Sequence, residues 1–339
     1  MYLPLEYKDL EEQDILVDVR APEEFESSTI EGAINIPILD NDERKIIGSL
    51  YKKNVQEAKK LAMKIGAKKL PEIYDMALEL EKTHKRIIFF CARGGMRSGV
   101  INNTLSSMGI RCRQLVGGYK SYRKYIMEIL PEFNDKLQYI VLHGNTGVGK
   151  TEILKQLEID GYPILDLEGS ANHRGSLLGS VGLGSCVTQK AFDSNVYNKL
   201  KNIDGPYIFV EAESRRIGNI FIPDYIHKKM KEGLHIFVGA DIDFRANLIV
   251  KEYTKYISSK EDIIFALDKL NKYISKDTIE EYKNLVESGQ FFIVTKELMI
   301  KYYDPMYTHT SDKYDYELKI QVDNIKNATK EIEKWLETR

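Results

Sequence analysis

The stretch HGNTGVGKT, residues 143–151, limits the possible folds of this chain more than any other part of the sequence. It matches the Walker A pattern, in which a glycine is followed by four residues and then by Gly-Lys-Thr. The apolar run LQYIVLHG precedes the loop and TEILKQLEID follows it, which predicts a strand before it and a helix after it. Backbone N–H groups in such a loop surround a phosphate, the lysine neutralises its charge, and the threonine hydroxyl can hold Mg²⁺.

This loop predicts a diphosphate site in an α/β domain. The predicted diphosphate-binding residues are Gly144, Asn145, Thr146, Gly147, Val148, Gly149, Lys150 and Thr151. ATP and GTP are the default ligands, but a loop of this kind binds diphosphates in general. A carboxylate is expected at the end of a later strand. The candidates are Glu211 and Glu213, with Asp166 and Glu168 as rivals. The sequence assigns no metal-ligating residues and no cofactor, although Mg²⁺ fits beside the loop.

A second glycine-rich loop, FFCARGGMRSG at residues 89–99, also follows an apolar strand. Its glycines allow consecutive backbone N–H groups to point at a bound anion. Two arginines and the start of a helix are expected to lower the pKa of the Cys91 thiol, and the thiolate is the nucleophilic form. Cys91 is therefore the predicted catalytic residue, whereas Cys112 and Cys186 lack such neighbours and are predicted to be inert. The predicted anion-binding residues beside Cys91 are Arg93, Gly94, Gly95, Met96 and Arg97.

Short apolar runs alternate with helical stretches along the chain, which predicts parallel α/β sheets. In the first series, strands are expected at 15–19, 33–38, 86–90 and 111–118, with helical residues at 41–81 and a helix after Cys91 that ends at Gly109. In the second series, strands are expected at 137–144, 162–169, 206–213 and 235–241, and the chain from about Phe244 is expected to be mostly helical. A proline and polar residues at 130–136 separate a predicted domain at 1–132 from one at 133–339.

The composition excludes several classes of protein. With 43% hydrophobic and 29% charged residues, the chain of 339 residues is expected to be globular and long enough for two domains. Three cysteines do not make a disulfide framework. No apolar run approaches the ~18 residues of a membrane span, so a cytoplasmic protein without a membrane partner is expected. A net charge of −2 means that a nucleic-acid partner needs a local basic patch.

Two polar segments after the Walker loop contain further candidate site residues. In the segment 171–176, His173 and Arg174 stand among other polar residues, which is typical of a functional loop. The segment VEAESRRIG at 210–218 adds Arg215 and Arg216 to the glutamates already named. No step is assigned to these side chains, and Asp304 in YYDPMY is given no role.

The first third of the chain resembles a rhodanese domain. The phrases that carry this resemblance are LVDVRAPEEF, EGAINIP, CARGGMRSG and LVGGYKSYR, between residues 16 and 123. The resemblance implies an α/β sulfurtransferase fold in which a loop cysteine carries a persulfide. The spacing of Cys91 and Arg97 also resembles phosphatases of the same fold, but Phe90 stands where those phosphatases usually have a histidine.

A rhodanese domain followed by a P-loop domain resembles the bacterial tRNA 2-selenouridine synthase family over nearly the whole chain. The supporting phrases are CARGGMRSG, HGNTGVGKTEIL, DLEGSANHRGSLLG, VEAESRRIG and YYDPMY, and Ala92 departs from the tryptophan expected in many relatives. The resemblance implies that selenium replaces sulfur at C2 of a wobble 2-thiouridine in tRNA. It implies two steps: geranyl diphosphate alkylates the sulfur, and selenophosphate then supplies selenium while geranylthiol leaves.

The resemblance also implies roles for the two loops. The P-loop binds the diphosphate of the geranyl donor, and residues 91–97 bind selenophosphate or hold selenium on Cys91, although the reverse allocation stays open. The implied partners are tRNA with a 2-thiouridine wobble base, small phosphorylated substrates and an enzyme that produces selenophosphate. Candidate tRNA-binding residues are Arg111, Arg113, Lys120, Arg123 and Lys124, interleaved with Tyr119, Tyr122 and Tyr125, which would suit stacking on a base.

Two alternatives remain open from the sequence. One is a rhodanese-type sulfurtransferase coupled to an ATP- or GTP-binding P-loop module, which nucleotide turnover dependent on Lys150 would favour. The other is a binding or regulatory protein whose two anion sites have lost their chemistry. The intact Cys91 and the intact loop at 144–151 argue against the second alternative.

Overall fold

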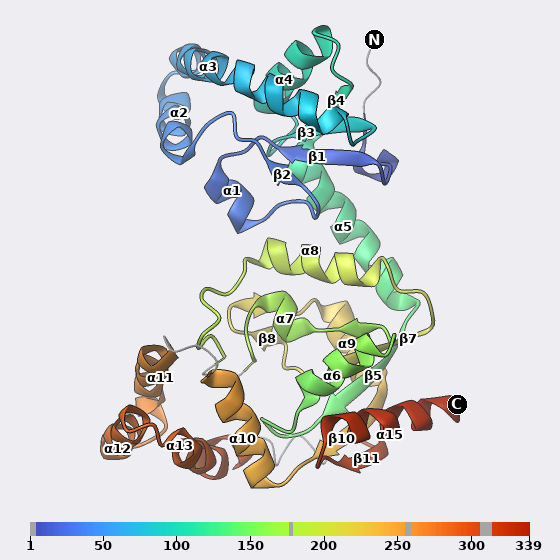
Figure 1. Cartoon of the computed structure of the whole chain (residues 1–339), viewed down its shortest axis with the longest axis vertical. Coiled ribbons are helices and arrows are strands. Elements are labelled where there is room, and N and C mark those ends of the chain that lie inside the picture. Colours follow the sequence, from blue (N-terminus) through green and yellow to red (C-terminus); the bar gives the residue numbers. More distant parts are fainter. Residues whose placement is uncertain (1–4, 176–178, 255–258, 306–313) are drawn as a thin grey trace. The chain divides into compact units, whose positions relative to one another are not determined.

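The computed structural model describes residues 5–175, 179–254, 259–305 and 314–339. The chain divides into two compact units, residues 1–130 and 131–339 (Figure 1). The boundary lies inside one helix, α5 (Gly118–Asp135), which continues through Pro131. Each unit has a parallel sheet with helices packed on it, and the second unit carries additional helices. The predicted fold class is confirmed.

The first unit is built on a four-stranded parallel sheet in the order β2-β1-β3-β4. The strands are β1 (Asp14–Asp18), β2 (Ile34–Asn35), β3 (Arg86–Phe90) and β4 (Cys112–Gln114). The expected strands at 15–19 and 86–90 are confirmed to within one residue. Those expected at 33–38 and 111–118 are shorter, and the second ends early because the chain turns at Gly117 and Gly118 into α5.

Helices cover both faces of this sheet. One face packs against α2 (Asn41–Lys53), α3 (Val55–Glu81) and α4 (Met96–Ser107), and together they enclose an apolar core. The region expected to be helical at 41–81 is two helices that meet at Asn54, whose side-chain oxygen accepts hydrogen bonds from the first N–H groups of α3. The short helix α1 (Pro22–Ser27) and α5 lie on the other side of the sheet in Figure 1.

The second unit has a five-stranded sheet in the order β11-β10-β5-β7-β6, and all its pairings are parallel. The strands are β5 (Gln138–His143), β6 (Ile164–Leu165), β7 (Tyr207–Glu211), β10 (Leu234–Gly239) and β11 (Tyr316–Gln321). The strand expected at 162–169 is wrong in its second half, because Asp166 begins the short helix α7 (Leu167–Ala171). The C-terminal region expected to be mostly helical also contains β11, an edge strand with exposed Glu317 and Lys319 that was not predicted.

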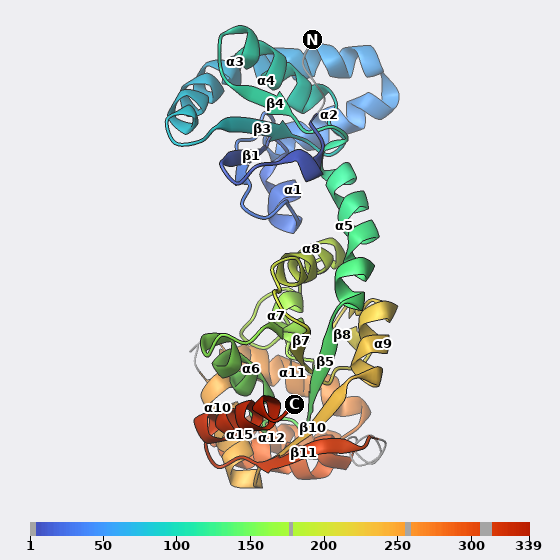
Figure 2. The same cartoon turned by 90° about the vertical axis from the view of Figure 1, so that its right-hand side faces the viewer.

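The helices of the second unit fall into two groups. Around the sheet, α6 (Lys150–Ile159) and α15 (Ile325–Glu337) share one apolar core with the strands, and α9 (Asp224–Glu232) lies on the opposite face (Figure 2). A separate apolar cluster joins the helices after β10. The remaining elements are α8 (Gln189–Leu200), the paired strands β8 (Arg216–Ile217) and β9 (Ile220–Phe221), α10 (Ile242–Tyr253), α11 (Ser259–Asp268), α12 (Lys276–Glu287), α13 (Phe291–Leu298) and a π-helical turn at Met299–Tyr303.

None of the helices in the described ranges combines the length and the apolar character needed to cross a bilayer.

The turn after β4 touches the cysteine loop through glycine. Gly118 has a φ of 56°, and a Cβ built there would overlap the Cys91 carbonyl oxygen. The backbone N–H groups of Tyr119 and Lys120, at the start of α5, donate to the carbonyl oxygens of Cys91 and Ala92 at 2.9 and 3.0 Å. The backbone of the segment LVGGYKS therefore binds and supports the backbone of the cysteine loop.

Gly118→Ala is expected to destabilise the first unit far more than Gly109→Ala. Both glycines have a positive φ, so either alanine costs about 1–2 kcal/mol in backbone strain. An alanine at Gly109 meets no atom within 4 Å, whereas one at Gly118 also displaces the cysteine loop, at about 1–3 kcal/mol more. Thermal unfolding of the two variants measures the difference. Equal melting temperatures would contradict the contact.

Candidate active-site loops

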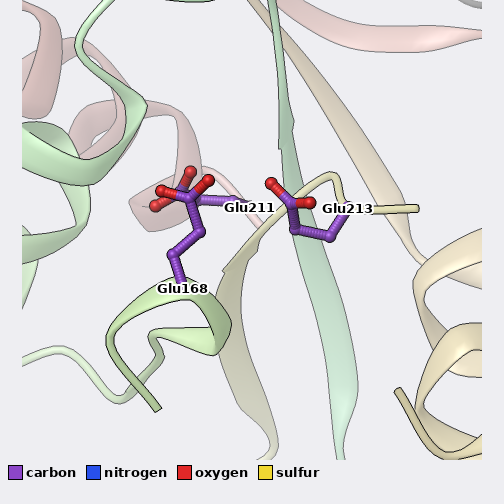
Figure 3. A group of neighbouring side chains, drawn as sticks. All are labelled: Glu168, Glu211 and Glu213. Carbon is purple, nitrogen blue, oxygen red and sulfur yellow. The ribbon is translucent and has the colours of Figure 1, made fainter. Parts of the chain in front are cut away.

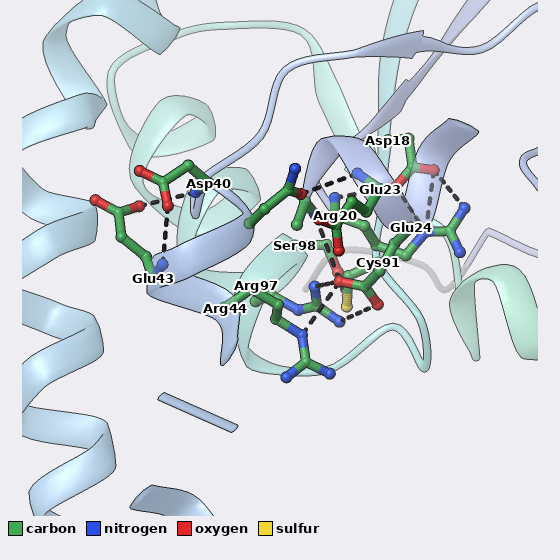
Figure 4. Close-up of polar contacts among 12 residues, drawn as sticks. Asp18, Arg20, Glu23, Glu24, Asp40, Glu43, Arg44, Cys91, Arg97 and Ser98 are labelled. Atoms are coloured by element: carbon green, nitrogen blue, oxygen red, sulfur yellow. Dashed lines mark hydrogen bonds and ion pairs between the residues drawn. The ribbon is translucent and has the colours of Figure 1, made fainter. Parts of the chain in front are cut away.

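Cys91 directly follows β3, and its sulfur accepts hydrogen bonds from its own loop (Figure 4). The Ser98 hydroxyl donates at 3.3 Å and the Gly95 backbone N–H at 3.4 Å. Burial raises the pKa of the Cys91 thiol, but hydrogen bonds from Ser98 and from the N–H groups of Arg93 and Gly95 outweigh burial and hold this pKa below its ordinary value. The loop therefore stabilises the thiolate form of Cys91 relative to that of an ordinary cysteine.

The cause of this low pKa differs from the expectation. Arg97 pairs with the Glu24 carboxylate at 2.6 Å, and Arg44 contacts the same carboxylate at 3.2 Å (Figure 4). Hydrogen bonds, and not the two arginines of the loop, have the largest lowering effects on the thiol pKa. The sequence reasoning gave Ser98 no role. The available signal was a hydroxyl in the first turn of the helix that follows the cysteine.

The P-loop connects β5 to α6. Gly149 precedes the helix with a φ of 92°, and Lys150 is its first residue. The Lys150 ammonium donates to the Gly144 carbonyl oxygen at 3.0 Å, across the loop that would surround a phosphate. A Cβ at Gly144 would overlap the Val238 carbonyl oxygen on β10, so the loop lies directly against a neighbouring strand.

An ion pair supports the P-loop from the C-terminal helices. Arg245 on α10 is buried and donates to the Thr146 carbonyl oxygen at 3.0 Å. It also donates to both carboxylate oxygens of Asp304, at 2.6 and 2.9 Å, and Asn145 donates to Asp304 at 3.1 Å. Asp304 was given no role from the sequence, and Arg245 was not singled out. Their pairing is a tertiary feature, because the two residues lie far apart in the chain.

Three glutamates meet beside the P-loop: Glu211 at the end of β7, Glu213 just after it, and Glu168 on α7 (Figure 3). One carboxylate oxygen of each lies within 4.8 Å of the others. Burial raises the pKa of all three, and Lys150 partly opposes this rise. Glu211 is only 3% exposed, and its Oε1 has no hydrogen-bond partner among the described residues.

Such a cluster must take up protons or a cation, because buried carboxylates repel one another. Glu168 and Glu211, considered as rivals from the sequence, lie together. Asp166 accepts a hydrogen bond from the Gly169 N–H at 2.7 Å and so caps α7. Three carboxylates beside the Thr151 hydroxyl are oxygen ligands of the kind that Mg²⁺ binds.

The remaining predicted polar residues are held by contacts within the second unit. His173 is half-buried, and burial lowers its pKa. Arg174 pairs with Glu252 and stacks on Tyr253, with its guanidinium carbon 4.7 Å from the ring centre. Arg215 and Arg216 are exposed. Arg215 pairs with Asp224, and Arg216 donates to the Gly218 carbonyl oxygen at 2.7 Å.

In the candidate tRNA-binding segment, several basic side chains are exposed to solvent, but two of the three tyrosine rings are buried. Arg111 pairs with Glu81 at 3.1 Å, Lys124 pairs with Glu128 at 3.7 Å, and Lys120 is exposed. Arg113 and Arg123 are half-buried. Tyr119 and Tyr122 are buried, at 5% and 0% exposure, so the expectation that they stack on a base is wrong. The Tyr119 ring lies 4.4 Å from the Arg20 guanidinium carbon, and the Tyr122 ring centre lies 4.7 Å from that of Tyr7.

The other two cysteines differ from Cys91. Cys112 is fully buried, and burial raises its pKa to about 11, so its thiol stays protonated near neutral pH. The Cys186 thiol is half-buried and donates to the Ala171 carbonyl oxygen at 3.1 Å. Within the described part of the chain, neither sulfur accepts the N–H and hydroxyl donors that Cys91 has.

Ser98→Ala is expected to raise the pKa of Cys91, because it removes the side-chain hydrogen bond that stabilises the thiolate. The rate of alkylation by iodoacetamide, followed against pH, reports the thiolate. The Cys91→Ser variant gives the alkylation rate of the other two thiols, which is subtracted. Ser107→Ala is a matched control on the same helix, since among the described residues its hydroxyl donates to the Thr104 carbonyl oxygen and does not contact Cys91. An unchanged midpoint in Ser98→Ala would refute the role of this hydroxyl.

Two family models match the two units of this chain, and each matched region contains one of the two loops. The family model "tRNA 2-selenouridine synthase AAA domain" matches residues 137–339, and the rhodanese-like model matches residues 4–125. Relatives named tRNA 2-selenouridine synthase come from Nitrosomonas eutropha (32% identity, covering 70% of this chain and 62% of the relative) and Bdellovibrio bacteriovorus (33%, 74% and 67%). Another comes from Pseudomonas syringae pathovar tomato (30%, 87% of each). The match to the Nitrosomonas relative thus spans less than two thirds of that protein. The predicted family is confirmed: this chain belongs to the tRNA 2-selenouridine synthase family.

Proposed function

We propose that this chain is a transferase that converts wobble 2-thiouridine in tRNA to 2-selenouridine through S-geranyl-2-thiouridine. Geranyl diphosphate and selenophosphate are the small substrates. Membership of the family supports the exchange of sulfur for selenium on a tRNA base. The choice of an isoprenoid diphosphate rests on one structural observation, an apolar cavity that adjoins the P-loop.

This cavity lies among α10, α11, α12 and α13. Thr146 of the P-loop forms part of its lining, and most of the other lining residues are apolar, including Ile249, Phe291 and Met299. A Cβ at Gly147 would come within 3.0 Å of Ile249 and Met299, so the loop and the lining are in direct contact. A hydrocarbon tail suits such a lining, whereas a ribose and base would leave polar groups without partners.

In the proposed first step, the sulfur of 2-thiouridine attacks C1 of geranyl diphosphate. The C1–O bond breaks, its electron pair leaves with the diphosphate, and the N3 proton of the base is lost. Lys150 and the N–H groups of residues 144–151 stabilise the negative charge on the leaving diphosphate. Arg245 and Asp304 hold the loop in place and are positioning residues.

In the proposed second step, selenium from selenophosphate bonds to C2, and the C2–S bond breaks. Geranylthiol leaves, and water takes up the phosphoryl group to give phosphate. The loop at 91–97 suits the anionic selenium donor, because its backbone N–H groups converge on Cys91 and Arg93 is exposed. An enzyme that makes selenophosphate is the corresponding supplier.

Mg²⁺ is the proposed metal of the second unit. Glu168, Glu211 and Glu213 would hold it, with the Thr151 hydroxyl close by. The orphaned Oε1 of buried Glu211 supports this fit. When bound, the ion would supply positive charge beside the diphosphate.

Lys150→Ala is expected to lower geranylation of a 2-thiouridine stem-loop about 100-fold or more, because it removes the main cation from the leaving diphosphate. Cys91→Ala is expected to spare geranylation and block formation of 2-selenouridine. Nucleoside mass spectrometry measures both products, with geranyl diphosphate alone and with selenophosphate added. An unchanged base under every condition, together with ATP turnover that needs Lys150, would replace this proposal by the coupled sulfurtransferase.

Glu211→Gln is expected to abolish the rise in melting temperature that Mg²⁺ produces in the wild-type protein. The Glu211 pKa is raised in the folded state, so without Mg²⁺ its effect on stability becomes unfavourable as pH rises. The variant should therefore be at least as stable as wild type at pH 8 when no cation is present. Glu158→Gln is the control, since Glu158 is exposed on α6 and paired with Lys199. Differential scanning calorimetry with and without Mg²⁺ measures the melting temperatures. If Mg²⁺ raised the melting temperature of Glu211→Gln as much as that of the wild type, this metal site would be excluded.

A further inference from the structure

A groove in the first unit runs from the cysteine loop over α2 and α3. It is lined by the loop residues Arg93, Met96 and Arg97 and by side chains of both helices. Cys91 is tied to the same loop through the N–H of Gly95, the residue before Met96. One wall of the groove is therefore the loop that holds the reactive thiol.

The floor of this groove is apolar and partly open to solvent. Ile38, Ile47 and Leu70 lie along it, and Met63 and Met96 are 58% and 56% exposed. Exposed apolar side chains that gather in one hollow are typical of a binding site. Small residues keep the hollow open: Gly48 on α2 and Ala62 on α3 also line it.

Cations stand around the apolar floor. Arg44, Lys45 and Arg97 are paired with Glu24 or Glu23. Lys52, Lys59 and Arg93 also line the groove, are exposed and have no ion pair within the described part of the chain. A ligand that matches this surface carries an apolar chain together with negative charges. An alkylated base within a polyanionic tRNA strand has both.

We propose that this groove binds the S-geranyl chain of the modified base, with the tRNA phosphates on its cationic rim, during the selenium step. This inference rests on the proposed function, and it adds a second apolar site to the cavity beside the P-loop. The chain is removed from water next to the Cys91 loop, which holds the C2–S bond near the site of selenium transfer. Geranylthiol then leaves along the apolar floor.

Gly48→Leu blocks the groove with little cost to the fold. A Cβ at Gly48 meets only the end of the flexible Arg44 side chain within 4 Å, and leucine favours a helix over glycine. Gln56→Leu is the matched control, because Gln56 is exposed on α3, is uncharged and does not line the groove. Both variants leave the P-loop unit unchanged in sequence.

The experiment compares two anticodon stem-loops, one with S-geranyl-2-thiouridine and one with S-methyl-2-thiouridine. Conversion to 2-selenouridine is measured with selenophosphate on the full chain, and binding is measured with Cys91→Ala. Wild type is expected to convert and to bind the geranyl substrate at least about tenfold better than the methyl substrate, because the longer chain removes more apolar surface from water when it is buried. Gly48→Leu should remove this preference, keep S-methyl conversion within about twofold and keep geranylation normal. Gln56→Leu should behave as wild type.

The two possible failures give different results. Conversion of both substrates at equal rates by wild type, or an unchanged preference in Gly48→Leu, would overturn the groove while the proposed function stands. Absence of conversion together with a binding preference that Gly48→Leu removes would support the groove and refute the selenium step. Equal binding of the two stem-loops would overturn the groove in either case.

Discussion

Each of the two proposed anion-binding loops depends on two backbone segments that approach each other at the carboxyl end of a parallel sheet. Gly118 lies against the Cys91 carbonyl group, and Gly144 lies against the Val238 carbonyl group. A side chain at either position would push the loop away from its neighbour. The positive φ angles at Gly118 and Gly149 then turn the chain so that a helix starts beside the loop. A helix start together with loop N–H groups is an arrangement that suits an anion, and both loops have it.

Charge in the two loops is compensated in different ways. In the second unit, buried Glu211 and half-buried Glu168 and Glu213 lie near the Lys150 ammonium group, so the cluster carries more acid than base. In the first unit, Glu24 is shared by Arg97 and Arg44, and Asp18 pairs with buried Arg20 at 2.6 Å. The acidic cluster fits a cation. The cysteine loop suits an anion, because its exposed Arg93 has no ion pair within the described part of the chain.

The residues of the two loops could be predicted from the sequence because each loop is a contiguous phrase in which chemistry requires glycine at fixed spacing. The central strands were also predictable, since β1, β3 and β5 are nearly continuous apolar runs. The edge strand β11 was missed although its residues, YELKIQ, alternate apolar and polar side chains as a half-exposed strand does. The tyrosines of α5 were misjudged because spacing among basic residues does not reveal which face is buried.

The sequence by itself determined the family, the succession of two α/β domains along the chain and the positions of both loops. Each of these depends on patterns formed by residues that are close together in the sequence. Only the tertiary structure decided what surrounds each loop. Ser98 supplies the hydrogen bond to Cys91, Arg245 and Asp304 support the P-loop, and Glu168 joins Glu211 and Glu213. The apolar cavity and the apolar groove likewise arise where separate helices meet. Contacts between residues far apart in the chain depend on packing, which no local pattern records.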